Sequence, residues 1–242
     1  MVGFMSMNVA AEQRPDSDVL MPGIICAVFT VLIVGCVFLV IWAVKRRRQQ
    51  VSDYANWAAQ SGYQYIQGDR SLADLSFRKP FRVGSARYGK DVFRGVYRGR
   101  HIVFGEYHYA TPGAEGRTNH HLIQVVAVAL PSPRPYLDIT REDAGTKFKA
   151  MFGARDLQVN HAEFDDRFHV DTDHVGFAHD ILTPGNIQWL LSDYRANMYQ
   201  FRFEGQWLMT LRPGRLDLNE VHFYADFLHD LIGIVPERVW QG

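Results

Sequence analysis

Cysteine is scarce in this chain of 242 residues, and its two cysteines, Cys26 and Cys36, both lie near the N-terminus. The long segment after residue 50 contains none. This absence excludes a disulfide framework, a thiolate metal site and a cysteine nucleophile in that segment. The sequence also lacks low-complexity stretches and internal repeats, while its aromatic content is high. These features favour a packed globular domain over a disordered region.

A net charge of one sign is also lacking, because 26 Lys and Arg residues balance 26 Asp and Glu residues. A nucleic-acid-binding domain is expected to be basic, so we expect no nucleic acid partner. The balance hides an asymmetry: cations dominate residues 70–100, and carboxylates dominate from Asp156 onward. Two interpretations remain open. The two regions pair with each other, or the basic region faces an anionic membrane leaflet.

Catalytic signatures are missing as well. No serine lies in the context of a nucleophile elbow. Gly95, Gly99 and Gly105 lie within two expected strands, and a phosphate loop instead needs glycines between a strand and a helix. We therefore expect no cofactor.

One long apolar run is present, from Met21 to Val44. It contains no charged residue between Ile24 and Val44. As a helix it would extend about 30 Å, which is enough to cross the hydrocarbon core of a bilayer. The basic block that follows at once is typical of a stop-transfer signal. We predict a transmembrane helix over residues 21–44. The residues expected at the membrane interface are Trp42, Lys45, Arg46, Arg47 and Arg48.

The charge difference across this helix predicts its orientation. Residues 1–20 are mildly acidic and residues 45–51 form a basic juxtamembrane linker, so the N-terminal tail is expected outside and residues 52–242 in the cytoplasm. A cleavable signal peptide would begin with positive charge and end before polar sequence. The segment Ile33–Cys36 has the shape of a lipobox. It is followed by more apolar residues, which favours two thiols inside a transmembrane helix over lipidation of Cys36.

The first part of the domain shows mainly strand patterns. A helix is expected from Ser52 or Asp53 to Gln60. A hairpin is expected from residues 92–97 and 101–107 around Arg98-Gly99-Arg100. Residues 121–130 are apolar on both faces and predict a central strand. Three prolines, at positions 131, 133 and 135, are expected to end that strand before a short strand at residues 136–139.

The second part mixes helices with a hairpin. We expect a short helix over residues 142–152, an extended segment at 168–170, a helix capped by Asp173 through Leu182, and a helix from Thr183-Pro184 to Tyr194. Alternating residues at 199–203 and 207–211 predict a hairpin that turns at Glu204-Gly205. A final helix, capped by Asp217 or Asn219, has an apolar stripe from Val221 to Ile232.

Strands that occur in hairpins indicate an α+β fold: one N-terminal transmembrane helix followed by a mainly antiparallel β-sheet domain with packed helices. The length after the anchor fits one domain over residues 52–242, or two lobes over about 52–140 and 141–242.

Histidines and carboxylates form two candidate metal sets. His108, His120 and His121 flank a loop close to Glu106, and His161, Asp165 and Asp171 lie in an acidic stretch. These are ligand types that zinc or a hard cation would accept. Neither spacing matches a strict motif, so we interpret both sets as surface residues and predict no metal. His222, Asp226 and His229 share one face of the last helix, which we expect to be solvated.

Several short segments resemble a family of uncharacterised actinobacterial single-pass membrane proteins, a domain of unknown function. They are Val83-Gly84, Arg94–Arg100, Glu106-Tyr107, Leu130–Pro135, Glu163–Phe168, Phe203–Gly205 and Val235–Trp240. The resemblance implies one N-terminal span with a domain of this kind. It brings no activity and no catalytic residues.

We favour a membrane-anchored cytoplasmic domain that binds a protein partner or anionic lipid headgroups beside the lipid bilayer, and that is not an enzyme. The alternative, from a different class, is a metal-dependent hydrolase that uses one of the His/Asp/Glu sets.

Overall fold

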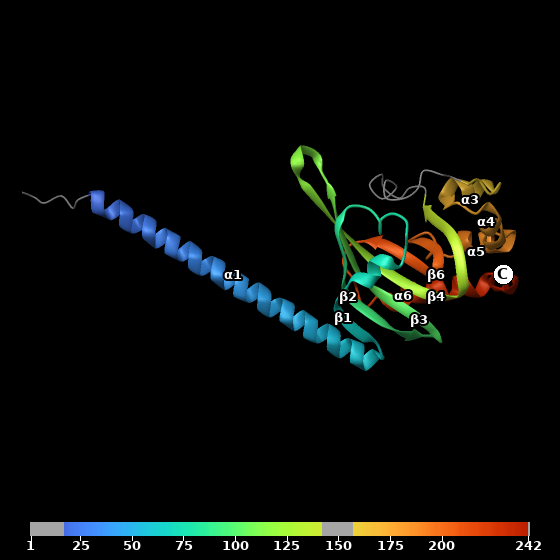
Figure 1. Cartoon of the computed structure of the whole chain (residues 1–242), viewed down its shortest axis with the longest axis horizontal. Helices are drawn as coiled ribbons and strands as arrows, with labels where there is room; N and C mark the ends of the chain where they lie inside the picture. The colour runs from blue at the N-terminus through green and yellow to red at the C-terminus, as the bar shows by residue number, and fades with distance from the viewer. Residues whose placement is uncertain (1–16, 142–156, 242) are drawn as a thin grey trace, which may run out of the picture. The chain divides into compact units, whose positions relative to one another are not determined.

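The structure is a computed structural model that describes residues 17–141 and 157–241, with side chains from residue 27. The chain divides into two compact units, residues 1–50 and residues 51–242 (Figure 1). Each unit is described by itself.

The first unit contains most of helix α1, Ser17–Ser61. Its large apolar side chains between Val28 and Val44 are exposed. Within the described residues, one helix is long and apolar enough to cross a membrane, and it begins at Ala27 in that range. It is a candidate membrane anchor. The helix runs through residues 45–51, where the sequence predicted a linker, and no new helix begins at Ser52. Lys, Arg and Gln are good helix formers, which is why this basic segment stays helical.

The second unit is built on one six-stranded antiparallel sheet (Figure 1). Its strands are β1 Gln64–Asp69, β2 Ser85–Tyr97, β3 Arg100–Pro112, β4 Thr118–Arg141, β5 Phe168–Thr172 and β6 Gln200–Pro213. Strands β1 to β5 pair in chain order. Leu137 pairs with Thr172 on β5 and with Phe203 on β6, so β5 and β6 lie on opposite edges of β4. The predicted α+β class is confirmed.

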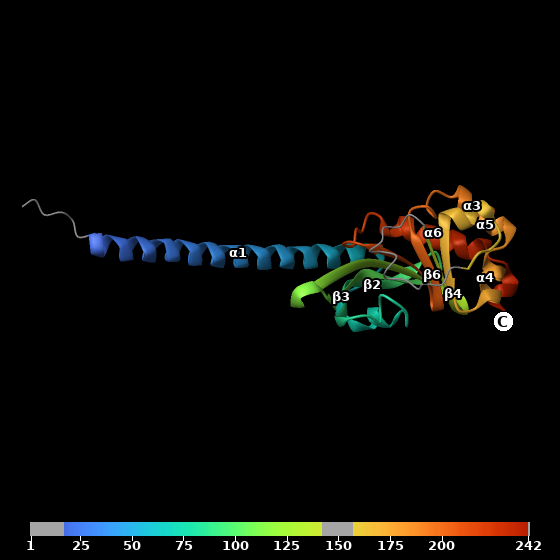
Figure 2. The same ribbon diagram turned by 90° about the horizontal axis from the view of Figure 1, so that it is seen from above.

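Helices cover one face of the sheet and a short segment covers the other (Figure 2). The helices are α3 Ala162–Arg167, α4 Val175–Ile181, α5 Pro184–Ser192 and α6 Val221–Ile234. Single turns are η1 Arg70–Asp74, η2 Ala114–Gly116 and η3 Glu237–Trp240. The larger core lies between the helices and the sheet and includes Phe104, Phe201 and Leu228. The smaller core lies on the opposite face and includes Leu72, Phe81 and Met209.

Several local predictions are confirmed. Strands β2 and β3 join through Arg98 and Gly99, with Tyr97 opposite Arg100. Both turn residues have positive φ, 48° and 80°, as a type I′ turn requires. Thr183 caps α5, and Pro184 occupies its first turn. The expected stripe of α6 is buried.

The three prolines do not end the central strand, which is a correction. Strand β4 is continuous from Thr118 to Arg141, but its register with β6 shifts between Ala129 and Leu137. Pairing with β3 stops at Val128 and pairing with β5 starts at Leu137. The prolines therefore occupy a stretch where only one neighbour is paired, and such a stretch tolerates residues without an N–H group.

The predicted hairpin at Glu204-Gly205 is also wrong. Residues 200–213 form the single strand β6, which pairs with β4 on both sides of Gly205. Gly205 has a φ of 57°, opposite Arg134 in the region of shifted register. The alternation on either side of this glycine resembles two hairpin arms, because the irregularity changes which residues face which core.

Two expected caps differ as well. His174, and not Asp173, caps α4 by accepting a hydrogen bond from the Phe177 N–H group. Glu220 precedes α6 without a side-chain cap, and Asp217 instead accepts from the Asn219 N–H group. The expected helix at 142–152 lies outside the described residues.

Candidate functional site

The first histidine set does not converge on one point. Cross-strand partners share a face of a sheet, so His120, opposite Ala110, lies on the face of His108. His121 lies on the other face, where its ring stacks on Tyr109 at 4.5 Å. His108 hydrogen-bonds Glu106 across 3.1 Å. The arrangement thus separates His121 from His108 and His120.

The second set serves local backbone structure. The ring of His161 caps α3, and Asp165 accepts from the N–H groups of Val159 and His161 at 3.0 and 3.1 Å. Asp171 accepts from the Tyr136 hydroxyl at 3.0 Å. In the part of the chain that the structure describes, no three His, Cys, Asp or Glu side chains are grouped as a metal site would need.

The predicted interface residues at the start of the chain are helical. The Arg46 guanidinium lies 5.3 Å from the centre of the Trp42 ring, and Arg47 donates to Gln50 at 3.1 Å. Lys45 and Arg48 belong to the same helix, α1.

The basic and acidic regions of the domain are joined by ion pairs. Arg78 pairs with Asp173, and Arg98 pairs with Asp226 and Asp230. These contacts connect cations of residues 70–100 with carboxylates of the second half, which supports the pairing interpretation. Most of these side chains remain over a third exposed, so each pair contributes little stability.

The face of α6 that was expected to be solvated is packed against aromatic residues, which is a correction. The Tyr63 hydroxyl lies 2.9 Å from His222 Nε2, and the Tyr97 ring stacks on His222 at 4.8 Å. Tyr97 also donates to Asp226 at 3.1 Å. Burial lowers the pKa of His229, and the nearby cations of Arg98 and Arg100 act in the same direction.

A buried polar cluster lies on the sheet face opposite the helices, where the C-terminal end of β4 pairs with the N-terminal end of β6. Arg202 and Asp138 are both fully buried, and Arg202 Nη2 donates to Asp138 Oδ2 at 2.5 Å. Gln200 Nε2 donates to the same carboxylate at 2.8 Å. The Tyr136 ring lies under the Arg202 guanidinium, 5.2 Å away. Burial raises the pKa of Tyr136 well above its usual value, and the charge of Asp138 adds to this effect.

This cluster fixes the segment of residues 76–84, which we call the Phe77 loop. Arg202 Nη1 donates to the carbonyl of Lys79 at 2.8 Å and to Ser76 Oγ at 3.2 Å. Glu204 accepts from the Phe77 N–H group at 2.9 Å and from the Ser76 hydroxyl. The buried charges thus hold the backbone of an exposed loop.

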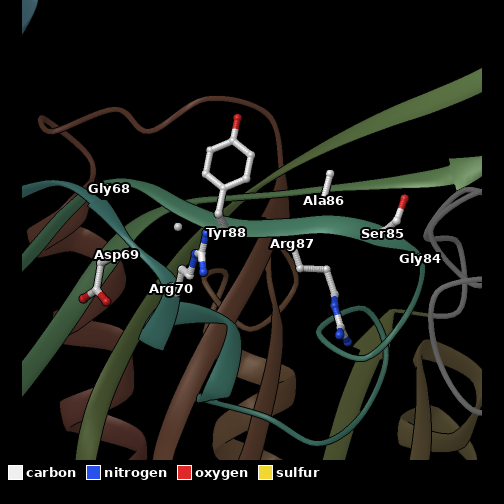
Figure 3. Close-up of a pocket in the computed structure, with 9 residues that line it drawn as sticks. Gly68, Asp69, Arg70, Gly84, Ser85, Ala86, Arg87 and Tyr88 are labelled. Atoms are coloured by element: carbon white, nitrogen blue, oxygen red, sulfur yellow. The ribbon is translucent and has the colours of Figure 1, made fainter.

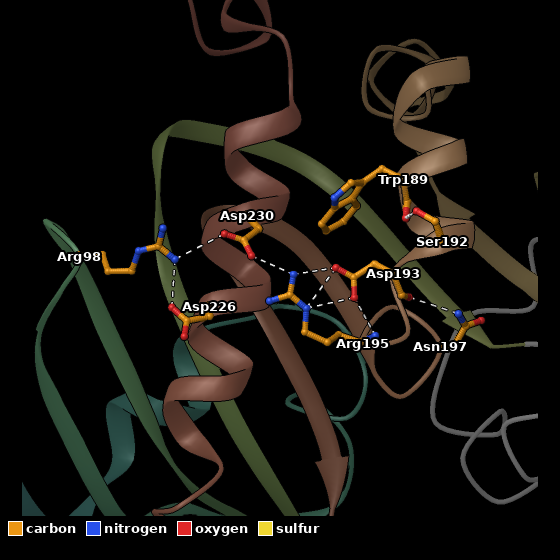
Figure 4. A network of polar contacts seen from close by, with 8 residues as sticks. All are labelled: Arg98, Trp189, Ser192, Asp193, Arg195, Asn197, Asp226 and Asp230. Carbon is orange, nitrogen blue, oxygen red and sulfur yellow. Dashed lines mark hydrogen bonds and ion pairs between the residues drawn. The ribbon is translucent and has the colours of Figure 1, made fainter.

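A second polar network holds residues 193–199, which we call the Tyr194 loop (Figure 4). Arg195 binds both carboxylate oxygens of Asp193 and reaches Asp230 on α6 at 2.8 Å. Asn197 donates to the carbonyl of Asp193 at 3.3 Å. Burial alone would raise the pKa of Asp193, but the hydrogen bonds and charge of Arg195 outweigh it and lower that pKa.

The Tyr194 loop presents two large side chains to solvent. Tyr194 is 63% exposed and Met198 is 59% exposed. Tyr and Met are enriched at protein interfaces, where they contribute large contact areas. An ordered loop loses less conformational entropy on binding than a mobile one. The arrangement therefore suits a docking surface.

A shallow hollow of about 790 Å³ lies beside β2 and is lined by Arg70, Arg87 and Tyr88 among others (Figure 3). Arg87 extends to one side of the strand and Tyr88 to the other (Figure 3). Arg87 Nη1 lies 3.4 Å from the carbonyl of Phe81, so its charge adds to the Phe77 loop.

Comparison with known proteins gives one solved structure. The crystal structure of the mycobacterial trehalose monomycolate transport factor A, TtfA, superposes with a TM-score of 0.52 over 77% of this chain and 96% of that chain, at 13% sequence identity. At this identity the likeness shows the fold alone. The mycobacterial source is consistent with the actinobacterial resemblance. No family model matches the sequence, and neither does any curated protein.

Sequence reasoning missed the buried cluster and both loops. The signal was present, because Gln200, Arg202 and Glu204 alternate with aromatic residues in one strand. Such alternation normally indicates a solvated second face. Only the contacts of residues 76–81 with that face show that it is covered.

Proposed function

We propose that this chain is a membrane-anchored interaction domain that serves as an accessory component of a membrane transport assembly. It acts by binding a protein partner and not by catalysis. The observation that carries the proposal is the ordered Tyr194 loop, which exposes Tyr194 and Met198 on a backbone fixed by Asp193 and Arg195. The likeness in fold to a transport factor and the apolar helix α1 support it.

The orientation belongs to the same proposal. The basic block Lys45–Arg48 supports a cytoplasmic C-terminal domain, because positive charge is enriched in cytoplasmic flanks of membrane helices. A reporter enzyme that is active only outside the cytoplasm, fused after Gly242, is expected to be silent. The same reporter fused before residue 20 is expected to be active. The reverse pattern contradicts the orientation.

Site-specific photo-crosslinking tests the interaction. A photoreactive amino acid at position 198 of the full chain, in membranes of an actinobacterial host, is expected to capture an integral membrane protein reproducibly. The matched control carries the same amino acid at Asp166, which is exposed on α3. Tyr194→Ala is expected to lower the yield at position 198. Equal capture from both positions contradicts the proposal.

The hydrolase alternative makes a different prediction. Metal analysis of the purified full chain would then give stoichiometric zinc or manganese, together with hydrolysis that a chelator abolishes. That result would replace the interaction proposal. We expect substoichiometric metal, because His108, His121 and Asp165 are engaged in local contacts.

A further inference from the structure

The Phe77 loop carries an aromatic side chain that its fold does not use. Phe77 is 72% exposed, which matches the exposure of the apolar side chains of α1. Its neighbour Phe81 is fully buried and lies 4.8 Å from the Tyr107 ring. The loop thus inserts one phenylalanine into the smaller core and presents the other to solvent.

Cationic residues follow Phe77 in the chain, and one of them lies against its ring. The Arg82 guanidinium lies 4.8 Å from the centre of the Phe77 ring, and Arg78 and Lys79 follow Phe77 directly in the chain. All three side chains are exposed. Arg87 reaches the same loop from β2 (Figure 3).

Two carboxylates oppose these cations without burying them. Arg78 pairs with Asp173, and Arg82 lies 3.4 Å from Asp74. Every member of these two pairs is at least 40% exposed. Exposed pairs are weak and solvent-screened, so the cations can still turn toward a second anionic surface. The loop therefore keeps a net positive field around one apolar ring.

The backbone beneath this surface is fixed. Glu204 holds the Phe77 N–H group and Arg202 holds the Lys79 carbonyl, and both charged residues are buried in the sheet. Arg78 also stacks over the buried Tyr136 ring at 4.7 Å. An aromatic residue held outward in this way costs little conformational entropy when it enters another phase.

We propose that the Phe77 loop docks on anionic lipid headgroups, with Phe77 at the interfacial level and Arg78, Lys79 and Arg82 on the headgroup charges. Phenylalanine side chains beside basic residues can enter the boundary between headgroups and acyl chains, and cations near an anionic leaflet gain electrostatic energy. The inference rests on the proposed membrane anchoring, since α1 keeps a lipid surface on the same chain. Weak contacts then suffice, because the anchor raises the effective concentration of lipid.

A fluorescent reporter on the full chain tests the docking. Cys26 and Cys36 are replaced by serine, and Ser85→Cys, at the end of the loop, carries an environment-sensitive dye. The chain is reconstituted in nanodiscs that contain a spin-labelled lipid as quencher. Quenching is expected to be about twofold or more stronger in discs with phosphatidylglycerol than in phosphatidylcholine discs. The quenching in anionic discs is expected to vanish at about 1 M salt, where charges are screened within a few ångströms.

Matched variants test whether the quenching depends on the cations of the Phe77 loop and on the Phe77 ring, or on surface charge and apolar side chains in general. Replacing Arg78, Lys79 and Arg82 with glutamine, or Phe77 with serine, is expected to reduce quenching to the level of neutral discs. The charge control replaces Arg117, Arg167 and Arg238, which are also exposed and ion-paired. The control for the loss of an exposed apolar side chain is Val175→Ser, which lies outside both loops. Both controls are expected to keep full quenching, and unchanged melting temperatures show that Phe77→Ser remains folded.

Three results would overturn the docking. Equal quenching in both kinds of disc would show that anionic lipid is not required. Quenching that survives the Phe77 and triple variants would show that the Phe77 loop is not the docking surface. Quenching that appears only after addition of the protein captured at the Tyr194 loop makes the Phe77 loop a protein contact instead. A chain that fails to enter nanodiscs contradicts the anchoring itself, whereas an inserted chain with a silent reporter contradicts only the loop.

Discussion

The strand pair β4–β6 has a first half, where residues 123–129 of β4 pair with residues 207–213 of β6, and a second half, where residues 134–139 pair with residues 201–205. The two halves are alike on the face toward the helices and differ on the opposite face. On the shared face, Val128 and Leu208 in the first half and Phe203 in the second half all contribute to the helix-covered core. On the opposite face, the first half presents Met209 to the smaller apolar core. The second half presents Arg202 and Asp138, equally buried but charged. The two halves are thus buried to a similar degree on this face, one with apolar side chains and the other with charged ones.

The difference shows what each half does for the surface above it. Apolar packing around Met209 is non-directional, and it holds the segment of η1 through Leu72 and Leu75, which belong to the same core. The charged half provides directional hydrogen bonds that fix individual backbone groups of the Phe77 loop. A loop that must present a side chain outward cannot be fixed by burying that side chain, so its backbone must be held instead.

The largest expected effect is in the charged half. Asp138→Ala leaves the Arg202 guanidinium buried without its carboxylate and is expected to lower the free energy of unfolding by about 3–5 kcal/mol. Asp138→Leu combined with Arg202→Met removes both charges and is expected to recover most of that loss. Denaturant unfolding of the full chain in detergent, followed by tryptophan fluorescence, measures both. Wild-type stability for Asp138→Ala alone would show that the pair is not buried in solution.

The apolar faces are expected to respond to volume and not to charge. Met209→Ala in the smaller core and Leu228→Ala in the larger core should each cost about 2–5 kcal/mol, because both side chains are fully buried. The conservative control Met209→Leu should cost less than about 1.5 kcal/mol. The same unfolding assay measures all three. An unchanged midpoint for Leu228→Ala would contradict the packing of α6 on the sheet.

The smallest effect concerns the partly buried pair of the Tyr194 loop. Asp193→Asn is expected to cost about 1 kcal/mol at neutral pH, in the range of surface ion pairs. The folded-state pKa of Asp193 is lowered from its ordinary value of 3.8 by Arg195, so the stability that its carboxylate provides is complete above that ordinary value. It is lost as the pH falls below 3.8 through the lower folded-state pKa. Melting curves of the wild type and the variant should therefore converge in acid, and a constant difference down to the lowest pH would exclude this linkage.

Much of the local structure follows from the sequence alone. The apolar run predicts α1 because a span without charge is stable as a helix in an apolar environment. The turn at Arg98-Gly99 and the start of α5 at Thr183-Pro184 are likewise determined by a few adjacent residues, since turn and cap chemistry are local. The stripe of α6 predicts its buried face because helical periodicity is also local.

Only the tertiary structure decided how the long strands are used. The alternation around Gly205 is equally consistent with two hairpin arms or with one strand that shifts register, and the partner strand β4 selects the second. The same partner keeps a strand continuous across three prolines. The burial of Arg202 and Asp138 depends on residues 76–81, which lie more than fifty positions away in the chain. A periodic pattern shows which side chains share a face, but whether that face meets water or protein depends on segments that are distant in sequence.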